Sequence, residues 1–136
     1  MNKIFEKTIY ICGVNMYGPD PIDSGIINSI ENYNGNYALG YLNNQGDGFI
    51  IKYVGRGDLK DRLDEHTNDD LYNCINDNYS QPYFAFVYLE NEKDSYNLEC
   101  IMYHEFENLL NINHPAFPKG KIYPCPYPYC DHGKSE

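Results

Sequence analysis

The sequence of 136 residues lacks an apolar run long enough to span a membrane. A membrane-spanning helix needs about 20 consecutive apolar residues. The apolar stretch nearest the N-terminus covers only residues 9–14, which is also short for the apolar core of a signal peptide. We therefore expect no membrane partner and a cytoplasmic location.

Basic residues are scarce. Ten Lys and Arg stand against 20 Asp and Glu, so the net charge is −10. Taken alone, this balance argues against a polyanionic partner, because affinity for nucleic acid comes largely from cations that neutralise phosphates. Lys52, Arg56, Lys60 and Arg62 nevertheless lie close together in the chain, and a local basic patch of this kind can guide a phosphate.

The chain has no full complement of paired cysteines, because five is an odd number. In the expected reducing compartment the thiols stay reduced. Cys12, Cys74 and Cys100 occur in apolar or mixed segments and are interpreted as packing residues.

The hydrophobic pattern predicts one domain of the α/β (α+β) class, since the length suits a single domain and no internal repeat is present. Apolar and β-branched runs predict a small three-stranded antiparallel sheet flanked by helices. The expected strands cover residues 37–42, 49–55 and 83–89, the last of them central, with an extra edge strand at 8–14. Gly and Pro residues predict a loop over 16–24.

Helices are expected over residues 58–67 and 95–110, capped by Asp58 and Ser95, with shorter helices at 25–31 and 69–77. In the helix over 95–110, Glu99 lies inside the apolar arc of the helical wheel and Glu105 lies at its opposite margin, whereas His104 and Glu107 point outward. A carboxylate in an apolar arc needs a cation or hydrogen bonds, so Glu99 is a candidate functional residue.

Three motifs follow one another in the chain: Gly35-Asn36-Tyr37, then Tyr53-Val54-Gly55, then a helix over 58–66 that carries Arg62 and His66. Together with Glu99 on a later helix, these motifs resemble the GIY-YIG nuclease domain family. The resemblance covers residues 35–113. It leaves residues 1–34 as an N-terminal extension and 114–136 as a C-terminal tail rich in Pro, Tyr and Cys, expected to be extended without helix.

The resemblance implies a divalent-metal-dependent endonuclease that hydrolyses phosphodiester bonds in DNA and leaves a 5′-phosphate and a 3′-hydroxyl. It implies that Tyr37 is the general base, that Tyr53 holds the phosphate or the water, and that Glu99 binds Mg²⁺ or Mn²⁺. Asn111 or Asn113 matches the asparagine that follows the family's last helix, and Asn113 is taken as the substrate contact.

The residue types suit this chemistry independently of the resemblance. Arg62 offers a planar, permanently charged fork for a phosphate, and His66, one turn later on the same helical face, can assist proton transfer. A tyrosine is a weak base because its pKa lies near ~10, and we expect cations from Arg62, Arg56 or the metal to lower it. Arg56, Lys52 and Lys60 are candidate substrate contacts. The acidic balance predicts weak intrinsic affinity, or delivery of substrate by a partner protein or a homodimer.

The tail holds a second candidate site. Cys125, Cys130, His132 and His114 are thiols and imidazoles of the kind that bind structural zinc. The favoured interpretation is free cysteines, because the spacing is looser than a pair of CxxC motifs. Two alternative functions stay open: a catalytically silent module of the same fold that binds nucleic acid or protein, and a zinc-stabilised interaction protein whose tail does the work.

Overall fold

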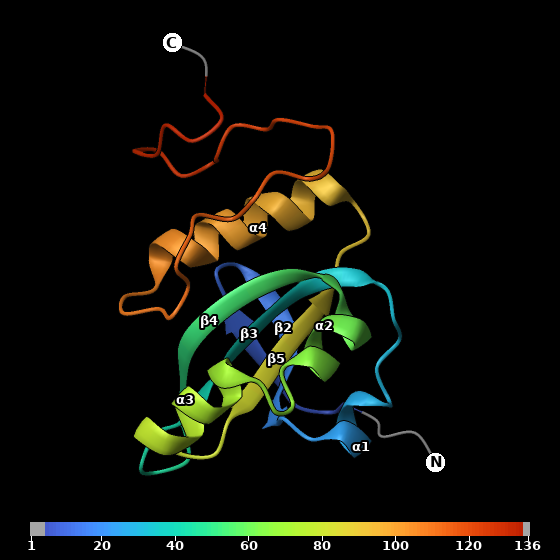
Figure 1. Ribbon diagram of the computed structural model, residues 1–136, viewed down its shortest axis with the longest axis vertical. Helices are drawn as coiled ribbons and strands as arrows, with labels where there is room; N and C mark the ends of the chain where they lie inside the picture. Colours follow the sequence, from blue (N-terminus) through green and yellow to red (C-terminus); the bar gives the residue numbers. More distant parts are fainter. Residues whose placement is uncertain (1–4, 135–136) are drawn as a thin grey trace.

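The computed structural model describes residues 5–134 and consists of a five-stranded antiparallel sheet with helices on both faces (Figure 1). The α+β class is confirmed, but the expected three-stranded sheet is wrong, because the N-terminal segment adds two strands. In chain order the elements are β1 (Thr8–Ile11), β2 (Val14–Pro21), α1 (Ser24–Ile27), β3 (Asn34–Leu42), β4 (Phe49–Asp58), α2 (Leu59–Glu65), α3 (Asp70–Asn78), β5 (Tyr83–Tyr88) and α4 (Glu92–Glu105).

The expected edge strand over 8–14 is divided by a tight turn. Cys12 and Gly13 both have positive φ, 48° and 85°, between the paired residues Ile11 and Val14. Two consecutive residues of positive φ match the right-handed twist of a two-residue hairpin. The chain therefore reverses at once, and β1 forms one edge of the sheet beside β2.

The loop expected over 16–24 is mostly strand β2. Its pairing with β5 shifts register between Tyr17 and Asp20, and Gly18 at φ 113° lies at this irregularity. A bulge accommodates a proline because the missing N–H is not needed in the ladder there. The Gly and Pro residues that indicated a loop therefore belong to a strand that contains a bulge.

The strand order is β1-β2-β5-β3-β4. The predicted central position of the third expected strand is confirmed, because β5 pairs with both β2 and β3. The predicted hairpin is β3 and β4, with Leu42 opposite Phe49 and Tyr37 opposite Gly55. Strand β4 is the second edge of the sheet, and this edge positions the candidate site.

Helices α1, α2 and α3 cover one face of the sheet. Their buried residues Ile27, Leu63 and Ile75 join a cluster that contains Tyr37 and Leu39 of β3. The first turn of α2 follows β4 directly. Asp58 occupies the N-cap position as expected, but its side chain makes no capping hydrogen bond.

Helix α4 covers the opposite face, where Leu98 and Met102 pack against Ala38 of β3 and Val54 of β4. It begins after Asn91, whose side chain accepts from the backbone N–H of Asp94, so the expected cap at Ser95 is wrong. It ends at Glu105, so the predicted extension to residue 110 is also wrong.

Ser95 is instead buried against the sheet. Its hydroxyl donates to the side-chain oxygen of Asn36 at 2.9 Å, and the amide of Asn36 donates to the Ser95 carbonyl at 2.9 Å. Asn36 is fully buried, and buried amides require such partners. This pair fastens β3 to the first half of α4 and explains why the middle position of the first motif is polar.

The tail packs over the outer side of α4, which therefore lies between the sheet and the tail (Figure 1). Tyr96 and Cys100 of α4 form a third buried cluster with Cys125, joined by Phe117 and Tyr123 of the tail. The expectation of a tail without helix is confirmed for residues 114–134. No helix within residues 5–134 has both the length and the apolarity needed to span a membrane.

Candidate active site

Two tyrosine rings lie side by side on the α2 face of the sheet. Tyr37 of β3 and Tyr53 of β4 stack with centroids 6.4 Å apart and an angle of 26° between the rings. Tyr37 lies across Gly55, and a Cβ at Gly55 would overlap the phenol ring. The glycine of the second motif thus gives the tyrosine of the first motif room to reach across β4.

His66, the C-cap residue of α2, contacts Tyr37 directly. The Tyr37 hydroxyl and His66 Nε2 are 3.0 Å apart, and His66 Nδ1 is 2.7 Å from Asp69 Oδ2. A carboxylate accepts from the ring, so Nδ1 carries the proton and Nε2 accepts from the phenol. The arrangement is a tyrosine–histidine–aspartate chain of hydrogen bonds.

Asp69 is the member of this hydrogen-bond chain that was not among the candidate residues expected from the sequence. Its Oδ1 accepts from the backbone N–H of Tyr72 at 2.9 Å and caps α3, which leaves Oδ2 for His66. The signal was present as an aspartate three residues after the candidate histidine, at the start of an expected helix. The sequence placed Asp69 at the start of this helix but gave no sign of its contact with His66.

Glu99 of α4 is buried, with 8% of its surface exposed. Its Oε1 forms an ion pair with Nη1 of Arg56, and Nη2 of Arg56 donates to the Ala116 carbonyl at 2.6 Å. Burial raises the pKa of Glu99 above its ordinary value, while the charge and hydrogen bond of Arg56 lower it in part. Arg56, expected at the substrate, instead satisfies the buried carboxylate.

The site extends across the edge of β4. Tyr37 and Tyr53 lie on the α2 face, and α4 packs on the other face. Glu99 nevertheless lines a hollow of about 660 Å³ together with Tyr53 and His66. It also lines an adjacent hollow of about 370 Å³ with Arg56 and Arg62. Because no further strand pairs with β4 on this side, side chains from both faces meet along its edge.

The Arg62 side chain lies close to the backbone of Gly57, which leaves room for it because glycine has no Cβ. A Cβ at Gly57 would lie 2.8 Å from Arg62 Nε, and Gly57 has a φ of 140° that favours glycine. The charged head of Arg62 stays accessible, with 51% of the side chain exposed and Glu65 Oε2 at 3.4 Å. An exposed pair of this kind contributes little to stability, so the guanidinium can turn to another anion.

Two of the expected substrate contacts lie away from these hollows. Lys52 is buried, and its Nζ donates to the Asn108 carbonyl at 2.6 Å, beneath the Tyr79 ring. It fixes the segment after α4 and does not face the site. Lys60 is half-buried on the first turn of α2 and lines neither hollow.

The two candidate asparagines have different positions. Asn113 is exposed and lines the larger hollow. Asn111 is bound to the edge of β4, where its Oδ1 accepts from Val54 N at 3.0 Å and its Nδ2 donates to Val54 O at 2.8 Å. The side chain of Asn111 therefore continues the sheet ladder and brings the following segment to the rim of the site.

Arg62 acts on the tyrosine pKa values in the expected direction, but the net shift of both pKa values is upward. Burial raises the pKa of Tyr37, and the neighbouring Tyr53 and Glu99 raise it further. Burial also raises the pKa of Tyr53. Arg62 lowers both pKa values, but its head is exposed to water and its effect is smaller than that of burial.

The structure brings together three of the four tail residues that were candidate zinc ligands. His114, Cys125 and Cys130 form a group with His104 of α4 in place of His132. The expectation that His104 points outward is wrong, because the tail covers that side of α4. All five cysteines are free thiols.

Comparison of the chain with family models, with curated proteins and with solved structures finds no match.

Proposed function

We propose that this protein is a divalent-metal-dependent endonuclease that hydrolyses phosphodiester bonds in DNA at the edge of β4. One observation carries the proposal: side chains from β3, β4, α2 and α4 converge there although they are far apart in the sequence. Tyr53 and His66 share the larger hollow with Glu99, Tyr37 is bonded to His66, and Arg62 shares the smaller hollow with Glu99. This set combines an acid, a base and a cation.

The hydrogen-bond chain supplies the route for the proton. The raised pKa of Tyr37 keeps its phenol protonated near neutral pH, so a free phenolate does not serve as the base. As water attacks phosphorus, Tyr37 takes the proton of the water and passes its own to His66 Nε2 at 3.0 Å. Asp69, which accepts from Nδ1, stabilises the imidazolium that forms.

The phosphate is positioned by Arg62. Its exposed guanidinium matches the geometry of two phosphoryl oxygens. The new bond joins the oxygen of the water to phosphorus, and the bond from phosphorus to the 3′ oxygen breaks. The departing oxygen takes a proton from solvent, which gives the 3′-hydroxyl and the 5′-phosphate that the family resemblance implies.

The carboxylate of Glu99 is a suitable ligand for a hard divalent cation. Mg²⁺ is commonly bound by one or two carboxylates, with the remaining ligands water and substrate oxygens. Glu99 offers one carboxylate in the wall of the hollow, and its ion pair with Arg56 occupies Oε1. The cation would stabilise negative charge on the phosphoryl and departing oxygens. Arg56, released from Glu99, would then provide a second positive charge for the phosphate.

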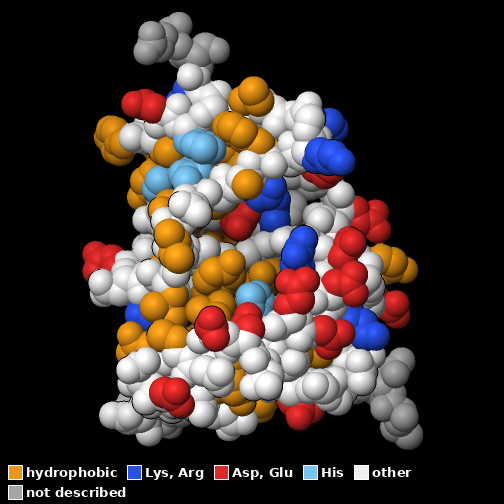
Figure 2. All heavy atoms as spheres, in the orientation of Figure 1, with side chains coloured by type: hydrophobic (Ala, Val, Ile, Leu, Met, Phe, Trp, Pro, Cys, Tyr) orange, Lys and Arg blue, Asp and Glu red, His pale blue; other side chains and the backbone are white. Residues whose placement is uncertain are grey.

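The surface charge of the protein limits its affinity for DNA. On the face shown in Figure 2, the basic side chains lie beside acidic ones and form no extended positive surface. With a net charge of −10, the isolated chain should bind DNA weakly and lose that binding readily as salt rises. We infer that a partner protein or a second copy delivers the substrate.

The test is nicking of supercoiled plasmid in Mg²⁺ or Mn²⁺. We expect Tyr37→Phe and Glu99→Gln to lower the rate by about 10²-fold or more, the range typical of a lost acid–base or metal-binding group. Tyr41→Phe is the matched control, because Tyr41 is on the same strand but stacks on Tyr79 with centroids 4.7 Å apart. Its rate should stay within a few-fold of the wild type.

Two results would overturn the proposal. Equal rates for Glu99→Gln and the wild type would remove Glu99 from the chemistry. Absence of nicking by the wild type on DNA or RNA, with retained binding, would support the silent module instead. The ion pair between Arg56 and Glu99 is the feature that favours this second interpretation, because it satisfies the carboxylate without a metal.

A further inference from the structure

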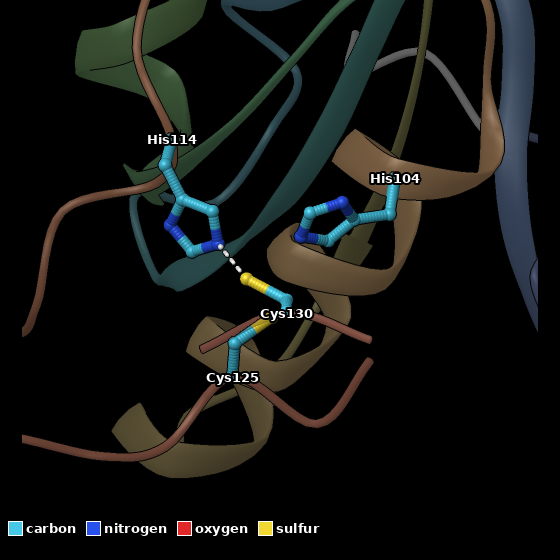
Figure 3. A group of neighbouring side chains, drawn as sticks. All are labelled: His104, His114, Cys125 and Cys130. Carbon is cyan, nitrogen blue, oxygen red and sulfur yellow. Dashed lines mark hydrogen bonds between the residues drawn. The ribbon is translucent and has the colours of Figure 1, made fainter. Parts of the chain in front are cut away.

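A second cluster of metal-binding side chains lies between α4 and the tail, and one of its members, His114, also lines the larger hollow of the candidate active site. One ligand atom from each of His104, His114, Cys125 and Cys130 lies within 4.8 Å of every other (Figure 3). His104 comes from the last turn of α4, and the other three come from the segment that follows. Cys125 is buried and the other three are half-buried.

His114 is already oriented as a ligand. Its Nδ1 lies 3.0 Å from the Pro115 carbonyl, which can only accept, so Nδ1 carries the proton. Nε2 is then unprotonated, and it lies 3.5 Å from Cys130 Sγ. Fixing one ring nitrogen by a backbone carbonyl is the usual way in which proteins orient a metal-binding histidine.

His104 has a buried atom without a partner. Its Nε2 is shielded from solvent and makes no hydrogen bond to any described residue. Such a group costs free energy unless something binds it. Cys100, four residues earlier on the same side of α4, is buried under the tail, so His104 faces the tail as well.

We propose that His104, His114, Cys125 and Cys130 bind one structural Zn²⁺. Two thiolates and two imidazoles form a complete tetrahedral donor set for zinc, and soft sulfur ligands disfavour Mg²⁺ or Ca²⁺. With metal–ligand bonds of about 2.0–2.3 Å, ligand atoms in such a site lie about 3.3–3.8 Å apart. Atoms already within 4.8 Å need only small side-chain movements, and the two thiols release their protons to solvent.

The zinc would fasten the tail to α4. Its ligands bracket the segment that contains Ala116, whose carbonyl accepts from Arg56. Pro115 and Ala116 also form part of the wall of the larger hollow. The metal is therefore a structural support for the wall of the candidate active site, and its binding does not depend on whether that site hydrolyses DNA.

The experiment measures zinc in the purified full chain after equilibration with Zn²⁺ and removal of the excess. We expect about one zinc per chain, and a loss of most of it in Cys125→Ser and in His104→Gln. Cys74→Ser is the matched thiol control, because Cys74 lies on α3 outside the group. His132→Gln tests the ligand expected from sequence, and this variant should keep its zinc.

Three measurements on the wild type keep the test independent of variant folding. Modification of the thiols should release the zinc, and Co²⁺ in place of Zn²⁺ should give the visible absorption of a tetrahedral site with thiolate ligands. Removal of the metal should lower Tm by about 5 °C or more. A wild type without stoichiometric zinc, or a His104→Gln variant that keeps it while His132→Gln loses it, would overturn the assignment.

Discussion

Replacing Arg56 with methionine should destabilise the protein by leaving Glu99 as a buried charge without its partner. The two side chains are 17% and 11% exposed, so water screens them little. Removal of one member of a buried pair costs about 3–5 kcal/mol. Because Arg56 keeps some contact with solvent, we expect a loss of about 2–3 kcal/mol in the free energy of unfolding at pH 7.

The loss should depend on pH. Without Arg56, burial raises the pKa of Glu99 further above its ordinary value, because the two effects of Arg56 that lower it are gone. A carboxyl group with a raised pKa in the folded state is best tolerated when protonated. Relative to wild type, Arg56→Met should therefore be most stable below about pH 4.3, the ordinary glutamate pKa, and lose stability as pH rises through the folded pKa.

Urea denaturation of four proteins tests this reasoning: the wild type, Arg56→Met, Glu99→Gln and the double variant. We expect the double variant to recover most of the stability lost in Arg56→Met, because no uncompensated charge remains. An Arg56→Met loss that is the same at pH 4 and pH 7, or a double variant no more stable than Arg56→Met, would refute the ion pair as the cause.

Three further predictions concern the surroundings of the site. Gly55→Ala should displace the Tyr37 ring and lower stability by about 1–3 kcal/mol; an unchanged near-ultraviolet tyrosine signal would contradict this. Lys52→Met should lower Tm while leaving DNA affinity unchanged, because the ammonium of this buried residue donates to the Asn108 carbonyl; weaker binding at constant Tm would restore Lys52 as a substrate contact. Asn111→Ala, which removes two hydrogen bonds to Val54, should speed hydrogen exchange of the Val54 amide, measurable by NMR.

Local patterns in the sequence predicted the parts of the fold that depend on near neighbours. The β3–β4 hairpin and the central strand β5 appear where β-branched and aromatic residues indicated them. Strand β2 was missed because Gly18 and the prolines beside it are typical of loops. Only the bulge in the pairing with β5 makes them compatible with a strand, and that bulge depends on a partner remote in sequence.

The candidate site was likewise predictable from the sequence only in part. The helical wheel singled out Glu99 as an acid in an apolar arc, and the structure shows it buried. The wheel could not identify its partner, because Arg56 is on a strand from another part of the chain. His104 was expected to face solvent, since an isolated helix shows no sign of a tail that folds back over it.

By itself, the sequence determined most of the strands and helices and which polar residues stand out, since backbone periodicity acts over a few residues. Tertiary structure alone decided that the sheet has five strands, that side chains from both of its faces meet at the edge of β4, and that two thiols and two imidazoles come together beside α4. These outcomes depend on how separate layers pack against one another, and no spacing within a single segment encodes that packing.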